Sequence, residues 1–183
     1  MTTTLVLGGA RSGKSRYAEQ LLRSRDDVVY VAPGPVPGTG DIEWADRVAA
    51  HRSRRPGSWR TLETDDLAGV LRAATGPVLV DCLATWLTAV VDAVGAWDDR
   101  ERASACVGAR TRELLAAWSA ATVDVVAVTN EVGMAVVPAT ASGRLFRDEL
   151  GRLNAAVSAA SDRVVLVVAG RVLDLSGCPV VEP

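Results

Sequence analysis

Several residue types that particular protein classes need are scarce in this chain. Its 183 residues include three cysteines, one histidine and one lysine, and the formal net charge is only -2. A charge this small gives no general attraction to nucleic acid, so we expect no nucleic-acid partner. The cysteines are odd in number, widely spaced and without a C-x-x-C pair, which argues against a disulfide framework and a zinc site. We therefore expect reduced thiols.

The chain also lacks the pattern of a leader or a membrane anchor. It begins MTTTLVLGG, where no basic region precedes a short apolar segment, so we expect no signal peptide, no membrane span and a cytoplasmic location. Apolar residues make up 49% of the chain, which is enough for a sizeable core despite the few aromatics. Without a visible repeat or linker, residues 1–183 are predicted to form a single domain.

Lysine occurs at one position only, and that position is informative. Lys14 lies in GGARSGKS, which matches the phosphate-binding pattern G-x-x-x-x-G-K-[ST] in full, and every other basic residue among the 20 Lys and Arg is arginine. The segment follows an apolar run and opens a helical pattern, so its backbone N–H groups can surround phosphate oxygens at a helix N-terminus. A glycine-rich turn without a ligand is the alternative.

Each position of this loop is a predicted nucleotide contact. We expect Lys14 to act as a catalytic residue on the terminal phosphates and the Ser15 hydroxyl to ligate Mg²⁺. The apolar run PVLVDC supplies Asp81, which we expect to hold the same metal ion. The alternative for Asp81 is a turn or helix cap. The predicted loop contacts are Gly8, Gly9, Ala10, Arg11, Ser12, Gly13, Lys14 and Ser15.

Short runs rich in β-branched residues alternate with helical stretches along the chain. This order predicts an α/β fold of the P-loop NTPase type, RecA-like, with a mostly parallel central sheet and helices on both faces. The segment Pro33–Gly40 is predicted to be a loop because Pro and Gly alternate there. The predicted strands are Thr3–Leu7, Val28–Ala32, Val78–Asp81, Val123–Thr129, Val164–Ala169 and Val172–Leu175. The predicted helices are Ser15–Arg23, Leu83–Val94, Arg100–Ala120, Gly143–Ala160 and one that starts at Asp41 and ends in the basic run His51–Gly57.

The only histidine, His51, is the one candidate for any step that needs an imidazole. A lone histidine after a helix is often a cap or a solvated surface group. Here Arg52, Arg54, Arg55 and Arg60 follow, so guanidinium groups could grip phosphate and keep the imidazole partly neutral. A neutral imidazole beside a bound triphosphate can attack phosphorus. For the arginines, an ordinary solvated basic face is the alternative.

Six segments carry further information because they occur in one order over nearly the whole chain. They are LVLGGARSGKSRYAE, VYVAP, ADRVAAHRSRRPGSWRTLE, VLVDCLATWLT, VTNEVGMAVVP and RLFRDELGRLNAAVSAASDRVVLVVAG. Together they resemble the bifunctional adenosylcobinamide kinase and adenosylcobinamide-phosphate guanylyltransferase family of cobalamin biosynthesis. The patterns H-x-x-x-R-P-x-x-W-[RK]-T-x-E and T-N-E-V-G-x-x-x-V-P are more particular to that family than the phosphate loop.

The resemblance implies two reactions. The first phosphorylates the aminopropanol hydroxyl of adenosylcobinamide, and the second transfers GMP from GTP to adenosylcobinamide phosphate through a guanylyl-histidine at His51. The implied co-substrates are GTP, with ATP as a further candidate phosphoryl donor, and Mg²⁺ accompanies them. The implied nucleotide contacts beyond the phosphate loop are Ala32, Pro33, Gly34, Arg52, Ser53, Arg54, Arg55, Glu63 and Asp81.

The chain departs from the family pattern around His51 and in the loop Pro33–Gly40, which is richer in proline and longer than in some relatives. Many relatives carry two consecutive histidines, whereas Ala50 precedes His51, so attack would rest on His51 alone. Arg54 stands where glycine is common, which leaves the backbone conformation there open. Two other functions also stay open: a small-molecule kinase that forms no histidine adduct, and a nucleotide-binding regulatory switch.

Two further expectations concern the sheet edge and the surface. Asn130 and Glu131 follow a predicted strand, so we expect them at the carboxyl edge of the sheet, where open α/β folds bind ligands. For Glu131 a helix-capping or loop-bracing carboxylate is the alternative. We also expect a homo-oligomer, because apolar surfaces around Trp86, Trp97 and Trp118 could stay exposed; packing of these side chains into the core is the alternative.

Overall fold

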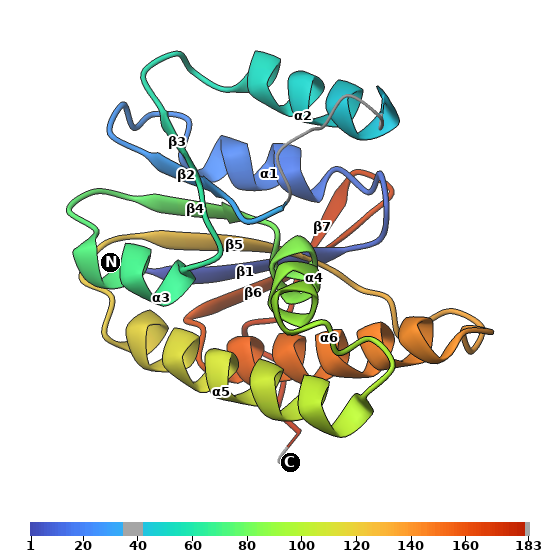
Figure 1. Cartoon of the computed structure of the whole chain (residues 1–183). Coiled ribbons are helices and arrows are strands. Elements are labelled where there is room, and N and C mark those ends of the chain that lie inside the picture. Colours follow the sequence, from blue (N-terminus) through green and yellow to red (C-terminus); the bar gives the residue numbers. More distant parts are fainter. Residues whose placement is uncertain (35–41, 182–183) are drawn as a thin grey trace.

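One mostly parallel sheet runs through the protein (Figure 1). The computed structural model describes residues 1–34 and 42–181, and within them seven strands lie in the order β3-β2-β4-β5-β1-β6-β7. Neighbouring strands pair in parallel, except that β7 runs antiparallel to β6. The strands are β1 (Thr3–Gly8), β2 (Val29–Ala32), β3 (Arg60–Glu63), β4 (Val78–Asp81), β5 (Val125–Asn130), β6 (Arg163–Val168) and β7 (Arg171–Asp174).

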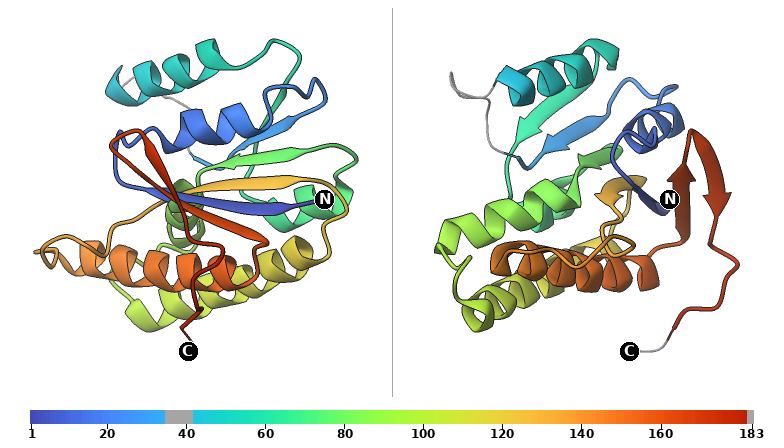
Figure 2. Two further views of the ribbon diagram at one scale, coloured as in Figure 1. Left: turned by 180° about the vertical axis from the view of Figure 1, so that it is seen from behind. Right: turned by 90° about the vertical axis from the view of Figure 1, so that its right-hand side faces the viewer.

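Helices cover both faces of this sheet. α1 and α2 lie on one side, and α3, α4, α5 and α6 lie on the other (Figure 1 and Figure 2). This arrangement and the strand order confirm the predicted α/β class with helices on both faces. The helices are α1 (Lys14–Leu21), α2 (Ile42–Arg54), α3 (Leu67–Ala73), α4 (Leu83–Val94), α5 (Arg100–Ser119) and α6 (Ala141–Ala159).

Alternate side chains of the central strand β1 point into two separate cores. Leu5 and Leu7 belong to the larger core, which α3 to α6 cover, whereas Val6 belongs to the smaller core with Ala18 of α1. Successive residues of a strand face opposite sides of the sheet, so a strand covered on both faces is apolar throughout. All six residues of β1 are buried. This double burial explains why the central strands are marked in the sequence by short apolar runs such as Leu5–Leu7.

The predicted strands and helices are present, with ends that shift by no more than about two residues. Two short elements were not predicted. β3 is an edge strand with largely exposed side chains, and α3 begins after Asp66, whose side chain accepts a hydrogen bond from the Gly69 N–H at 2.9 Å. Of the predicted loop Pro33–Gly40, only Pro33 and Gly34 belong to the described residues.

Trp86 and Trp118 do not form the apolar surface on which an oligomer was expected. Trp86 and Trp118 are each 1% exposed and belong to the larger core, and Trp97 packs against that core as a partly buried side chain. The alternative interpretation, packing into the core, therefore holds for Trp86 and Trp118. Across residues 1–34 and 42–181, no helix combines the length and the apolar character needed to cross a membrane.

The carboxyl ends of three central strands bring the sequence motifs together. β5 lies between β1 and β4, with Gly8 of β1 paired to Asn130 of β5, and Asp81 of β4 paired to Val128. The N–H of Glu131 donates to the carbonyl oxygen of Gly8 at 3.2 Å, which ties the end of β5 to the start of the phosphate loop. Asn130 and Glu131 thus lie at the predicted edge of the sheet.

Candidate active site

The phosphate loop joins β1 to α1 and has little room for side chains. A Cβ atom at Gly8 would come 2.6 Å from the carbonyl oxygen of Val167 in β6, closer than real Cβ contacts. Gly13, with φ of 101°, has a left-handed conformation that favours glycine. The ammonium group of Lys14 donates to the carbonyl oxygen of Gly9 at 3.1 Å, and its side chain is almost fully buried. Two glycines of the motif are therefore required by the backbone path.

The turn between β6 and β7 contacts this loop. Ala169 and Gly170 both have positive φ, 49° and 74°, and the Gly170 N–H donates to the carbonyl oxygen of Ser12 at 3.0 Å. The Ser12 hydroxyl is buried and has no hydrogen-bond partner within the described part of the chain. The loop is thus held by contacts from the C-terminal hairpin as well as by its own helix.

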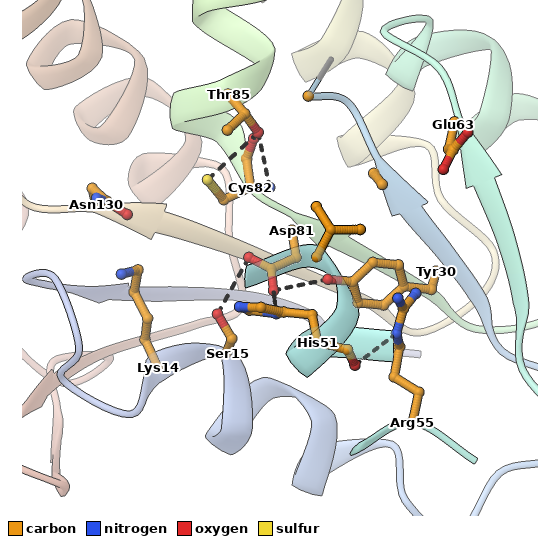
Figure 3. Close-up of a pocket in the computed structure, with 13 residues that line it drawn as sticks. Lys14, Ser15, Tyr30, His51, Arg55, Glu63, Asp81, Cys82, Thr85 and Asn130 are labelled. Atoms are coloured by element: carbon orange, nitrogen blue, oxygen red, sulfur yellow. Dashed lines mark hydrogen bonds and ion pairs between the residues drawn. The ribbon is translucent and has the colours of Figure 1, made fainter. Parts of the chain in front are cut away.

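Asp81 contacts three other residues of the pocket, Ser15, Tyr30 and His51 (Figure 3). Its Oδ1 accepts a hydrogen bond from the Ser15 hydroxyl at 3.3 Å, and its Oδ2 accepts one from the Tyr30 hydroxyl at 3.0 Å. The carboxylate is 8% exposed, and His51 Nδ1 lies 3.3 Å from Oδ2. Asp81 at the end of β4 therefore connects the phosphate loop, β2 and α2.

His51 lies in the last turns of α2, where the predicted basic run begins. Its ring lines the same pocket as Lys14 and Asp81, and its side chain is 28% exposed. Besides Asp81, Nδ1 is approached by Arg54 Nη2 at 3.2 Å. The structure thus places the only imidazole within contact of the carboxylate that also accepts from the phosphate-loop serine.

The arginines after His51 have different partners from one another. Arg54 binds Glu19 of α1 through Nε and Nη2, at 3.2 and 3.1 Å. Arg52 pairs with Glu63 of β3 at 2.8 Å. The Ser53 hydroxyl donates to the Ala50 carbonyl. Arg52 and Arg54 therefore attach α2 to β3 and to α1.

Arg55 is the arginine of this run that lines the pocket. Its guanidinium carbon lies 3.8 Å from the ring centroid of Tyr30, a cation–π arrangement. Its Nε donates to the His51 carbonyl at 3.1 Å, and its Nη1 donates to Thr61 Oγ1 at 2.9 Å. Partial burial lowers the pKa of Arg55 below its usual range. Burial, and then the charge of Asp81, raises the pKa of Tyr30, so its hydroxyl stays protonated and donates.

The pocket gathers part of the predicted set and adds residues that were not predicted. Predicted residues that line it are Lys14, Ser15, Ala32, Gly34, His51, Arg55, Glu63 and Asp81. Predicted residues outside its lining are Gly8, Gly9, Ala10, Arg11, Ser12, Gly13, Pro33, Arg52, Ser53 and Arg54. Tyr30, Val48, Cys82 and Thr85 line it without having been predicted, and Asn130 lines it after having been placed only at the sheet edge.

Among these residues that were not predicted, Thr85 left a signal in the sequence. The Thr85 hydroxyl donates to the Cys82 carbonyl at 2.9 Å and accepts from the Cys82 N–H at 3.3 Å, at the start of α4. In a capping box the side chain at the third helical position accepts from the N-cap N–H, and Thr85 does so here, although Glu or Gln is the usual residue at that position. Tyr30 has no comparable signal, because it interrupts an apolar strand in the way that a core tyrosine would. Burial raises the pKa of the Cys82 thiol, which keeps it neutral.

The residues at the phosphate loop fit a magnesium ion of the kind that accompanies nucleotides. The Ser15 hydroxyl and Asp81 Oδ1 are 3.3 Å apart, and both are oxygen ligands. Mg²⁺ at nucleotide sites takes few protein ligands and completes its shell with phosphate oxygens and water. No group of three His, Cys, Asp or Glu side chains suited to a metal occurs in the described segments.

A solved structure of a prototypical ATPase from the type III secretion system of pathogenic bacteria has the same type of fold. Its TM-score is 0.58 at 14% identity, over 90% of this chain and 50% of the ATPase chain. The chain therefore spans half the length of that ATPase. At this level of identity the likeness shows the fold alone and nothing about the reaction.

Sequence comparisons are more specific. The family model CobU, cobinamide kinase / cobinamide phosphate guanyltransferase, matches residues 4–175. The bifunctional adenosylcobalamin biosynthesis protein CobU of Salmonella typhimurium is 39% identical over 175 residues, 91% of this chain and 95% of that protein. The bifunctional protein CobP of Pseudomonas aeruginosa is 40% identical over 180 residues, 96% of this chain and 98% of that protein. The chain therefore belongs to the cobinamide kinase / cobinamide phosphate guanyltransferase family.

Proposed function

We propose that this protein carries out both reactions of its family in the pocket around Lys14, Asp81 and His51. It phosphorylates adenosylcobinamide with a nucleoside triphosphate, and it transfers GMP from GTP to adenosylcobinamide phosphate. The observation that carries this proposal is the position of the only histidine, whose Nδ1 lies 3.3 Å from the Asp81 carboxylate that accepts from Ser15. One nucleotide site can then present either the γ- or the α-phosphorus to a nucleophile.

For phosphoryl transfer, the protein supplies position and positive charge. The backbone N–H groups of the phosphate loop and the Lys14 ammonium face the phosphate oxygens, and the acceptor hydroxyl attacks the γ-phosphorus in line. Ser15 and Asp81 would hold Mg²⁺, which when bound neutralises charge on the phosphates. Whether ATP or GTP is the donor is decided by comparing the two nucleotides at equal concentration with adenosylcobinamide as acceptor.

For guanylyl transfer, His51 supplies the nucleophile. An imidazole nitrogen forms a bond to the α-phosphorus of GTP, and the bond from that phosphorus to the bridging oxygen breaks, so pyrophosphate leaves. An oxygen of adenosylcobinamide phosphate then attacks the same phosphorus, and the imidazole leaves with its electron pair. Arg55 lines the pocket and contacts the His51 carbonyl, so its guanidinium can supply positive charge beside the nucleophile.

Labelling with GTP that carries ³²P in the α-phosphate tests the proposal directly. We expect the protein to retain label after denaturation, with the acid-labile and base-stable behaviour of a phosphoramidate. His51→Ala should retain none. Label that survives in the variant would remove His51 as the nucleophile, and a wild-type protein that phosphorylates cobinamide but takes up no label would be a kinase alone.

A second comparison separates the two activities. Lys14→Ala should lower both by at least about 100-fold, because both reactions use the same phosphate loop. His51→Ala should abolish guanylyl transfer and leave most of the phosphoryl transfer. Equal loss of both activities in His51→Ala would contradict this division of roles.

We also place the protein in the cytoplasm, as proposed from its sequence. Cys82, Cys106 and Cys178 are free thiols, which is consistent with a reducing compartment. Fractionation of cells that express the protein, followed by immunodetection, would test this.

A further inference from the structure

The two ring nitrogens of His51 have very different surroundings. Nδ1 lies 3.3 Å from Asp81 Oδ2 and 3.2 Å from Arg54 Nη2, so protein groups approach it from two sides. In the view of Figure 3 the other ring nitrogen, Nε2, points to the side of the pocket where Ser15 and Lys14 lie. A phosphorus atom that approaches Nδ1 would have to displace both neighbours, whereas Nε2 is directed toward the phosphate loop.

The neighbours of Nδ1 also favour one tautomer. A carboxylate only accepts hydrogen bonds and a guanidinium only donates them, so Nδ1 cannot satisfy both. Arg54 has acceptors of its own, since it donates to both carboxylate oxygens of Glu19 and to the Ala50 carbonyl. Asp81 is almost buried, and a bare nitrogen lone pair against its negative oxygen would be repulsive. A hydrogen on Nδ1 removes that repulsion and leaves the lone pair on Nε2.

The carboxylate that faces Nδ1 is itself held in place. The Ser15 hydroxyl donates to Oδ1 and the Tyr30 hydroxyl donates to Oδ2, so each oxygen has a fixed donor on a different element. The plane of the carboxylate therefore cannot turn without the loss of one of these hydrogen bonds. A fixed acceptor beside a histidine is the usual means of setting its tautomer and orientation.

From these contacts we propose that Asp81 is a positioning residue for His51 and that Nε2 is the atom that receives GMP; this inference rests on the proposed function. The Nε2 lone pair forms the bond to the α-phosphorus, and pyrophosphate leaves with the electron pair of the broken P–O bond. Nδ1 keeps its proton, and the positive charge of the resulting imidazolium faces Asp81. When the corrinoid phosphate attacks, the N–P bond breaks and its electron pair returns to Nε2.

Because His51 is the only histidine, nuclear magnetic resonance can test this without any assignment step. The full chain is labelled with ¹⁵N-histidine and purified without a histidine tag, so the spectrum contains one imidazole. After reaction with GTP and Mg²⁺, coupling between ³¹P and ¹⁵N identifies the nitrogen that carries the phosphorus. We expect Nε2. Phosphorus on Nδ1 overturns the inference while the proposed function stands, whereas a protein that forms no adduct loses the proposed function itself.

The tautomer of the free protein gives a second readout, which needs neither nucleotide nor metal. In the neutral ring of the wild-type protein we expect the proton on Nδ1. Asp81→Asn keeps the size of the side chain and removes its charge, so the preference for Nδ1–H should weaken. Tyr17→Phe removes a hydroxyl outside the pocket and should leave the preference in place. A wild-type ring protonated on Nε2, or an Asp81→Asn spectrum equal to that of the wild type, contradicts the role of Asp81.

Discussion

The hydroxyl of Tyr30 donates to Oδ2 of Asp81 at 3.0 Å, across neighbouring parallel strands. Tyr30 is 3% exposed, and the Asp81 carboxylate is 8% exposed, so water cannot replace this hydrogen bond easily. The face of the same ring makes a second contact, with the Arg55 guanidinium. One tyrosine therefore supports both the carboxylate and the arginine of the pocket.

Replacement of Tyr30 by phenylalanine separates these two functions. Tyr30→Phe keeps the aromatic face under Arg55 and removes only the donor to Asp81. A hydrogen bond to a charged, nearly buried group contributes about 1.5–3 kcal/mol, so the free energy of unfolding in urea should fall by that amount. The rate of guanylyl-histidine formation should fall about tenfold at saturating GTP, because the carboxylate beside His51 is less well held.

Tyr17 provides the matched control, since it is the only other tyrosine. Its hydroxyl oxygen accepts a hydrogen bond from Arg163 at 3.0 Å, outside the pocket. Tyr17→Phe also removes one phenolic hydroxyl, but the rate of guanylyl-histidine formation should not change. Equal rates for Tyr30→Phe and the wild type would show that the hydroxyl of Tyr30 does not support the site.

Gly8 should tolerate no side chain. A methyl group there would lie 2.6 Å from the Val167 carbonyl and 2.5 Å from the Ser12 hydroxyl oxygen, so β1, β6 or the phosphate loop must shift. Overpacking of this sort costs about 1–3 kcal/mol, which thermal or urea unfolding of Gly8→Ala would measure. Because the displaced backbone carries the phosphate contacts, the affinity for GTP measured by calorimetry should fall as well.

Gly151 on the exposed face of α6 is the contrasting position. Nothing lies within 4 Å of a Cβ placed there, so Gly151→Ala adds no clash. Alanine in a helix interior is favoured over glycine by about 0.5–1 kcal/mol, and this variant should be more stable than the wild type with unchanged GTP affinity. If Gly8→Ala and Gly151→Ala both lowered the stability, the clash at Gly8 would not explain the loss of stability in Gly8→Ala.

The elements that the sequence predicts well are those buried on both faces. β1 contains the apolar run Leu5–Leu7 and β4 the run Val78–Val80, because neither face of the central sheet meets water there. α4 was predicted with the ends that it has. β3 could not be predicted in the same way. Its four residues, RTLE, lie at the sheet edge with mostly exposed side chains, so they carry no apolar pattern, and pairing with β2 alone defines them as a strand.

In the candidate site, too, the sequence predicts the local features, but it does not predict contacts between residues that are distant in the chain. The phosphate loop is local, since its glycines and its lysine are set by one turn of backbone, and the pattern alone predicts it. The partners of Arg54 and Tyr30 are tertiary. Arg54 stays a predicted nucleotide contact. Its carboxylate partner in the structure is Glu19 on α1, and no spacing in the sequence reveals that contact.

Asp162 should make the free energy of unfolding vary with pH in the acid range. The backbone N–H and the hydroxyl of Thr3 both donate to its Oδ2, and these hydrogen bonds lower the pKa of the carboxyl group. A carboxyl with a lowered pKa in the folded state contributes stability above its unfolded pKa, and this contribution is lost as the pH falls through the folded value. Urea unfolding from about pH 6 to pH 3 should therefore show a smaller acid-dependent loss for Asp162→Asn than for the wild type. Identical pH dependence would contradict this assignment.

Arg54 should act through the position of α2, because its guanidinium is bound to Glu19 through two hydrogen bonds while Glu19 itself is nearly buried. Arg54→Met removes this contact from one end, and Glu19→Gln weakens it from the other by removing the charge and one of the two acceptor oxygens. Each should slow guanylyl-histidine formation to a similar extent, and the double variant should be no slower than the worse single one. The cycle should give a coupling of about 1–2 kcal/mol. If Arg54 instead served by contact with phosphate, Arg54→Met would be far more severe than Glu19→Gln, and the effects of the two changes would add.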